Sequence, residues 1–155
     1  MTTTNEQPST ARRTGGVADL LFRSAVTAHA VAAFGQPVFA GVYLTGEIGG
    51  LDWHARGADT VFSLGLLQAA AGVAVRARTR RWWPAAVSLL IVAAETGQYL
   101  AGMSGLLWVH LPLGVMTIAA LAVLAAAVWV RPLPRGAVAG RADGVNEARR
   151  DAVDV

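Results

Sequence analysis

Two histidines in this chain could bind one metal centre together. His54 follows "LDW" at the start of one apolar segment, and His110 follows "LWV" at the start of another. If both segments are helices that begin on the same membrane side, the two imidazoles lie at similar depth and can face one interior. One nitrogen ligand on each side is what axial coordination of a haem iron requires. We therefore treat His54 and His110 as candidate metal ligands; the alternative is that each is a hydrated side chain at a membrane interface.

Three neighbouring residues extend this candidate cofactor site. Gly57 and Gly114 lie one turn after the two histidines, where the missing side chains would leave room for a porphyrin face. Arg56 could pair with a haem propionate, because a guanidinium binds carboxylates well. Asp52 and Asp59 lie within one turn of Arg56, so an exposed charge cluster is the alternative.

A column of polar residues runs through apolar segments and is the second candidate site. Glu95 lies in the middle of "AAVSLLIVAAETGQYLAG", where an isolated ionised carboxylate is strongly disfavoured. At about 1.5 Å per residue, His29 and Gln68 lie at a depth similar to that of Glu95, and Gln36 and Gln98 form a second level. This column is either interhelical hydrogen bonding or a proton relay towards a redox centre or a bound quinone.

The elements that must position these residues are membrane spans. The chain has 155 residues, 54% of them hydrophobic and 15% charged, which is too apolar for a water-soluble domain of this size. Runs of about 20 apolar residues predict transmembrane helices. Four such runs are present, at about residues 20–45, 54–76, 83–103 and 106–130. They make residues 18–130 an all-α, integral membrane, antiparallel four-helix bundle, and the polar segments 1–17 and 131–155 are expected to be disordered tails.

The basic residues predict the orientation of the bundle. All 13 of them are arginines. Arg56 is the one arginine on the membrane side where His54 and His110 are expected to lie. Short cytoplasmic loops retain positive charge, so both termini and the "RARTRR" loop should be cytoplasmic. We attribute the basic character to this asymmetry in a bacterial plasma membrane, and no nucleic-acid partner is expected. There is no cysteine, which excludes disulfides and thiolate metal sites.

Two stretches resemble a known family. "FAGVYLTGEIGGLDWHARGA" followed by "GQYLAGMSGLLWVHLPLGV" is similar to one four-helix half of the heme A synthase family, and to small uncharacterised bacterial four-helix membrane proteins. The resemblance covers about residues 35–120. It implies a bis-histidine haem b in the outer half of the bundle, held by His54 and His110.

The chain departs from that family in two ways. The family has two such halves, and it carries a catalytic carboxylate three residues before the second-helix histidine. Here that position is Leu51, and the nearby Asp52 and Glu47 are out of register. No catalytic residues or hydrolase and nucleotide-binding motifs are found. The sequence therefore predicts a cytochrome-b-like electron-transfer or haem-handling protein rather than an enzyme, with a redox membrane partner, a quinone or a second copy as possible partners. The alternative is a cofactor-free membrane protein that stabilises a larger membrane complex.

Overall fold

A computed structural model describes residues 16–131 and contains four long helices. In chain order they are α1 (Val17–Leu44), α2 (Gly49–Thr79), α3 (Trp83–Met103) and α4 (Leu107–Val130). The described part of the chain has no strand. The predicted all-α four-helix bundle is therefore confirmed. The two predicted tails lie outside the described residues, apart from Gly16, Val17 and Arg131.

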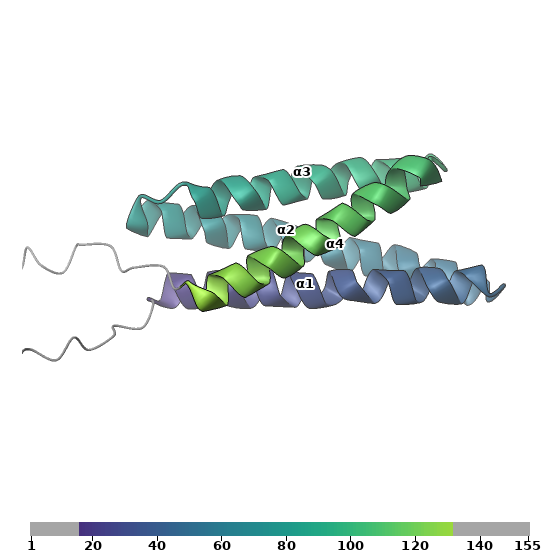
Figure 1. Cartoon of the computed structure of the whole chain (residues 1–155), viewed down its shortest axis with the longest axis horizontal. Helices are drawn as coiled ribbons and strands as arrows, with labels where there is room; N and C mark the ends of the chain where they lie inside the picture. The colour runs from purple at the N-terminus through teal and green to yellow at the C-terminus, as the bar shows by residue number, and fades with distance from the viewer. Residues whose placement is uncertain (1–15, 132–155) are drawn as a thin grey trace, which may run out of the picture.

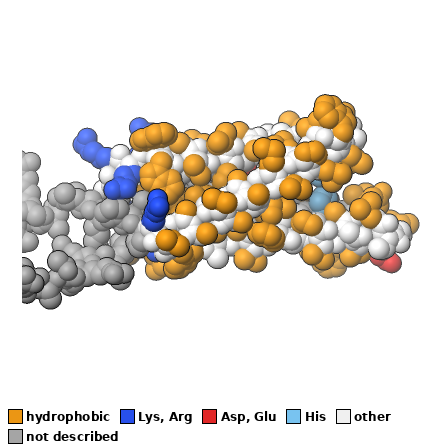
Figure 2. All heavy atoms as spheres, in the orientation of Figure 1, with side chains coloured by type: hydrophobic (Ala, Val, Ile, Leu, Met, Phe, Trp, Pro, Cys, Tyr) orange, Lys and Arg blue, Asp and Glu red, His pale blue; other side chains and the backbone are white. Residues whose placement is uncertain are grey.

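All four helices are long and apolar enough to cross a membrane. The shortest, α3, has 21 residues and measures about 32 Å, which matches a hydrocarbon core of about 30 Å. Apolar side chains cover most of the lateral surface in Figure 2, whereas the arginines gather at one end. A surface of this kind is stable against lipid but not against water. The chain is a small multi-pass membrane protein.

The helices run up and down, so each packs against its neighbours in a ring. The adjacent pairs are α1 with α2, α2 with α3, α3 with α4, and α4 with α1, which leaves α1/α3 and α2/α4 as the two diagonals. One end of the bundle holds the α2–α3 connection and the start of α1, and we call it the arginine end. The other holds the α1–α2 and α3–α4 connections, and we call it the histidine end.

Helix α4 crosses the others obliquely, which makes the two ends of the bundle different. In Figure 1 its last turns lie against the start of α1, whereas its first turns lie beside the end of α3. At the arginine end Trp129 donates a hydrogen bond to Thr27 at 3.0 Å, and the Arg23 guanidinium lies 5.5 Å from the Trp129 ring centroid. Arg23 is buried and forms an ion pair with Asp19, one turn earlier on α1. These contacts close the arginine end, and the bundle is more open at the other.

The apolar core lies in the arginine half of the bundle. Phe22, Val26, Val75 and Leu121 have no exposed surface there. Gly72 lets α2 approach α3 closely, since a Cβ at this position would lie 2.8 Å from the Pro84 carbonyl oxygen. A layer of buried polar side chains follows towards the middle, and beyond it the interior holds a cavity.

Helix α2 begins five residues earlier than the predicted span. The segment before His54 is rich in glycine and polar residues, which is typical of a loop, yet it is helical from Gly49. Gly50 makes this possible, because a Cβ there would lie 2.4 Å from the Tyr43 backbone nitrogen. The helix can therefore turn back directly against α1. His54 consequently lies in the second turn of α2 and not at its first residue.

Candidate functional site

A cavity of about 350 Å³ occupies the histidine half of the bundle. Its volume is within the range of about 300–1,000 Å³ typical of ligand sites. All four helices contribute to its walls, which are mostly apolar, and both His54 and His110 line it. Figure 2 shows a hollow at this end with a histidine side chain visible inside it.

His54 and His110 face each other across the α2/α4 diagonal. Their ring centroids are 5.9 Å apart, and the ring planes make an angle of 79°. Both side chains are half-buried. The two helices are not adjacent, so the pair meets in the bundle interior and not along a helix–helix contact.

Each of these rings is held by a backbone carbonyl. Nδ1 of His54 lies 3.3 Å from the Gln36 carbonyl oxygen on α1, and Nδ1 of His110 lies 2.8 Å from the Gln98 carbonyl oxygen on α3. A carbonyl oxygen can only accept, so the proton of each neutral imidazole is on Nδ1. The Nε2 lone pair of each ring is then free to bind a metal. A histidine that ligates a metal usually donates its other N–H in this way.

The glycines after the histidines accommodate glutamine side chains. A Cβ at Gly57 would lie 2.1 Å from the Gln36 amide nitrogen, and one at Gly114 would lie 2.7 Å from the Gln98 amide oxygen. The space that the sequence suggested for a porphyrin face is thus occupied by Gln36 and Gln98. These glycines let the glutamine-bearing helices come close enough for their carbonyls to hold the imidazoles.

Arg56 lies outside the cavity lining and forms an exposed ion pair. Its Nε is 3.0 Å from Asp52 Oδ2, one turn earlier on α2. Asp59 does not pair with it and instead accepts a hydrogen bond at 3.0 Å from the Tyr99 hydroxyl on α3. This geometry matches the surface-charge alternative, and binding of a propionate by Arg56 stays a prediction.

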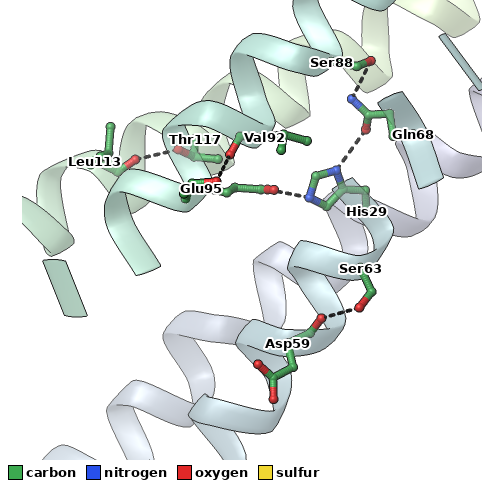
Figure 3. Close-up of polar contacts among 10 residues, drawn as sticks. His29, Asp59, Ser63, Gln68, Ser88, Val92, Glu95, Leu113 and Thr117 are labelled. Carbon is green, nitrogen blue, oxygen red and sulfur yellow. Dashed lines mark hydrogen bonds and ion pairs between the residues drawn. The ribbon is translucent and has the colours of Figure 1, made fainter. Parts of the chain in front are cut away.

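The level of the polar column that contains His29, Gln68 and Glu95 forms a buried network across α1, α2 and α3, which the side chains of Gln36 and Gln98 do not join. Nε2 of His29 lies 2.6 Å from Glu95 Oε1, and Nδ1 of His29 lies 3.0 Å from Gln68 Oε1. Gln68 donates to Ser88 Oγ at 3.2 Å, and Ser88 donates to the Pro84 carbonyl at 2.8 Å. Figure 3 shows Glu95 pointing towards His29, and His29 towards Gln68. The structure thus brings together the three residues that the depth argument put at one level.

The donor and acceptor in each of these hydrogen bonds can be assigned by starting from the Pro84 carbonyl. The Pro84 carbonyl can only accept, so the Ser88 hydroxyl donates to it and Ser88 Oγ accepts from the Gln68 amide. The Gln68 oxygen therefore faces His29, and His29 Nδ1 must carry a hydrogen. A bare Nε2 opposite a bare carboxylate oxygen at 2.6 Å would be repulsive, so one proton lies between His29 and Glu95. This network fixes the orientation of His29 by linking it through Gln68 and Ser88 to the Pro84 carbonyl, and a proton relay through Glu95 and His29 stays a prediction.

Glu95 also has an oxygen without a partner. The residue is 3% exposed and lines the cavity, and its buried Oε2 makes no hydrogen bond within the described structure. Gly65 on α2 makes room for it, since a Cβ there would lie 2.5 Å from Oε2. Among the cavity-lining residues that the structure describes, Glu95 is the one carboxylate.

Gly65, Gly102 and Ser88 were not singled out from the sequence. A Cβ at Gly102 would lie 2.9 Å from His110 Nδ1, so this glycine lets the His110 ring lie against α3. The spacing offered one signal: Gly65 precedes Gln68 by three residues and so shares its helix face. Gly102 and Ser88 carry no comparable signal, because glycine and serine are common in membrane helices.

Two imidazoles and one carboxylate are the imidazole and carboxylate groups among the described cavity-lining residues. No group of three or more His, Cys, Asp or Glu side chains in residues 16–131 is arranged to hold a metal. Two imidazoles on opposite sides of one metal, with bonds of about 2 Å, would have ring centroids about 6 Å apart. The observed 5.9 Å agrees with this spacing. Ligation of a haem by these two histidines stays a prediction.

No protein-family model, curated protein or solved structure matches this chain significantly. The resemblance to one half of the heme A synthase family stays a prediction from sequence.

Proposed function

We propose that this protein binds one haem b through His54 and His110 near the histidine end of the bundle. One observation carries the proposal. Two imidazoles from diagonal helices lie with ring centroids 5.9 Å apart, both Nδ1 atoms are held by carbonyl oxygens, and both residues line one cavity.

A bound haem would supply a one-electron redox centre, and the protein would tune it. The carbonyls of Gln36 and Gln98 fix the ring orientation of the two histidines and make Nε2 more basic. The apolar walls exclude water and lower the local dielectric constant, which affects the redox potential. Between them these residues provide binding, orientation and water exclusion.

The proposed role is electron transfer between membrane partners, or haem handling, without catalysis by the chain itself. Leu51 replaces the catalytic carboxylate of the resembling family, and Glu47 and Asp52 are both exposed. Neither lines the cavity. A redox-active membrane protein is the kind of partner that an electron-transfer role requires.

The arginine distribution supports an orientation in the membrane. The described arginines lie at the arginine end, except Arg56. By the positive-inside rule this end faces the cytoplasm, together with both termini, and the haem lies near the outer face of a bacterial plasma membrane. Trp53 and Trp108 at the histidine end, and Trp82 and Trp129 at the other, are all exposed, as expected for aromatic belts at the two interfaces.

The test is an absorption spectrum of the full chain, purified in mild detergent from haem-supplied cells. We expect a Soret band with sharp reduced-state bands. His54→Ala and His110→Ala should each abolish bis-histidine ligation and most of the bound haem. His29→Gln, which can keep a hydrogen bond to Glu95, should leave the spectrum nearly intact. A well-folded, colourless wild-type preparation would overturn the proposal and favour the cofactor-free alternative.

A further inference from the structure

The inner end of the cavity has an unmet acceptor that the haem proposal does not use. Glu95 Oε2 is buried without a partner, although Oε1 of the same carboxyl is firmly bound to His29. Burying an acceptor without a partner costs about 1–3 kcal/mol. Glu95 lines the cavity, whereas Oε2 itself lies against Gly65 of α2, so a ligand in the cavity reaches Oε2 through a small shift of the Glu95 side chain.

The chemistry of the His29–Glu95 pair tells which kind of ligand. The shared proton lies between Nε2 and Oε1 whether it is formally on the imidazole or on the carboxyl. In the first form Oε2 belongs to a carboxylate, and in the second it is a carbonyl oxygen. Oε2 is therefore an acceptor in both forms and requires a donor such as a hydroxyl.

The surroundings of Oε2 indicate an apolar ring. Phe62 precedes Gly65 by one turn and Tyr99 follows Glu95 by one turn, so both lie next to Glu95 on the side of the histidine end. Their ring centroids are 6.4 Å apart, and both line the cavity. Two aromatic side chains over a mostly apolar cavity favour a flat ring that they can pack against.

We propose that Glu95 binds the hydroxyl of an apolar, membrane-soluble phenol or quinol at the inner end of the cavity, with Phe62 and Tyr99 packing against its ring. The ligand's hydroxyl donates to Oε2, while His29 holds Oε1. A quinone without its hydrogens offers only acceptors and is bound less well. The site does not rest on the haem proposal, because the residues it uses are other than His54 and His110, although all of them line the same cavity.

The experiment compares two probes on one preparation of the full chain in mild detergent. The probes are a hydroquinone with an alkyl tail and its dimethyl ether, which has the same ring but no donor. Binding is measured by isothermal titration calorimetry. We expect the hydroquinone to bind the wild-type protein about tenfold more tightly, a factor within reach of one hydrogen bond to Oε2 in either form of the pair. Equal affinities would overturn the proposal and leave Oε2 to water.

Variants of Glu95 locate the effect. Glu95→Leu should bring the two affinities to within about twofold, and Glu95→Gln, which keeps an oxygen but no charge, should reduce the preference to a few-fold. Glu47→Leu and Glu47→Gln are the matched controls, since Glu47 is exposed in the α1–α2 connection, and both should keep the full preference. If Glu95→Leu does not fold, Glu95→Gln decides. A preference unchanged in the folded Glu95 variants would place the donor's partner elsewhere and refute the site.

The haem proposal is tested separately on the same samples. His54→Ala should lose the haem spectrum and keep the hydroquinone preference. A reduced preference in Glu95→Gln with a normal haem spectrum would give the opposite pattern, so the two proposals can fail independently.

Discussion

Replacing Glu95 with leucine tests how far the buried network stabilises the fold. The substitution keeps a side chain of similar size but leaves His29 Nε2 without its partner at 2.6 Å. Interhelical hydrogen bonds measured in membranes average about 0.6 kcal/mol, whereas an acceptor left unpaired in a dry interior costs about 1–3 kcal/mol. His29 is fully buried, so water cannot take the place of Glu95. The second value therefore applies.

Two effects of this substitution act in opposite directions. Stranding His29 lowers stability, and removing the unpartnered Oε2 raises it. We expect Glu95→Leu to lower the free energy of unfolding by about 1–2 kcal/mol. Glu95→Gln should remain within about 0.5 kcal/mol of wild type, because its amide can donate to His29 Nε2. Unfolding by a denaturing detergent, followed by tryptophan fluorescence, measures both values.

A double-mutant cycle separates the pair from its surroundings. His29→Leu strands Glu95 Oε1 and Gln68 Oε1 together, so it should cost more than Glu95→Leu. The double variant strands only Gln68 and should therefore cost clearly less than the sum of the two single variants. Additive costs, or a Glu95→Leu variant as stable as wild type, would refute the argument that the pair shares a proton in a dry interior. Glu47→Leu, on the surface, should change stability by less than about 0.5 kcal/mol.

Three further predictions concern the histidine end and the orientation. Gly57→Ala and Gly114→Ala should each weaken haem binding about tenfold or more, because the new methyl group displaces the glutamine whose carbonyl orients a ligating histidine. Gly97→Ala is the control and should leave haem binding unchanged, since the nearest atom to its Cβ would be 3.6 Å away. Arg56→Gln should shift the free energy of unfolding by less than about 1 kcal/mol, as expected for an exposed pair, and a loss of haem affinity would instead assign Arg56 to a propionate. Reporter fusions in the α2–α3 connection and at the C-terminus should read cytoplasmic and one in the α1–α2 connection outside; the inverse pattern would put the haem site at the inner face.

The fold could be predicted because the solvent dictates it. A bilayer requires about 20 apolar residues per span and full backbone hydrogen bonding, so four apolar runs leave few alternatives to a helical bundle. The start of α2 was missed for a physical reason. Hydropathy reports lipid contact, and the first turn of α2, with Leu51 and Asp52, is helical because Gly50 permits close packing on α1.

The buried His29–Glu95 pair could be predicted from the sequence, whereas the geometry of the site of His54 and His110 could be predicted only in part. Glu95 is too costly to leave alone in a membrane, so counting turns was enough to bring His29 and Gln68 to its level. The carbonyls that hold His54 and His110 belong to the backbone, and every residue has one. Nothing in a sequence distinguishes the carbonyls of Gln36 and Gln98 from the rest.

The two helical hairpins repeat one arrangement and depart from it at one level. In each, a glutamine on the first helix presents its carbonyl to a histidine on the second and places its side chain against a glycine one turn further on. The repetition ends one turn deeper, where Glu95 lies three residues before Gln98 and Ala33 lies three residues before Gln36.

Both Glu95 and Ala33 are buried, so their difference is not one of solvent exposure. A symmetric pair of rings suits a ligand with two equivalent axial positions, such as a haem iron. The carboxyl of Glu95, which lies one turn deeper in the bundle, has no such counterpart on α1 and suits a ligand that needs a single hydrogen-bond acceptor. α1 contributes His29 one turn deeper than Ala33, and His29 pairs with Oε1 of Glu95. Joining α1 to α3 therefore accounts for one oxygen of Glu95, and Oε2 is the oxygen for which the structure shows no partner in the described residues.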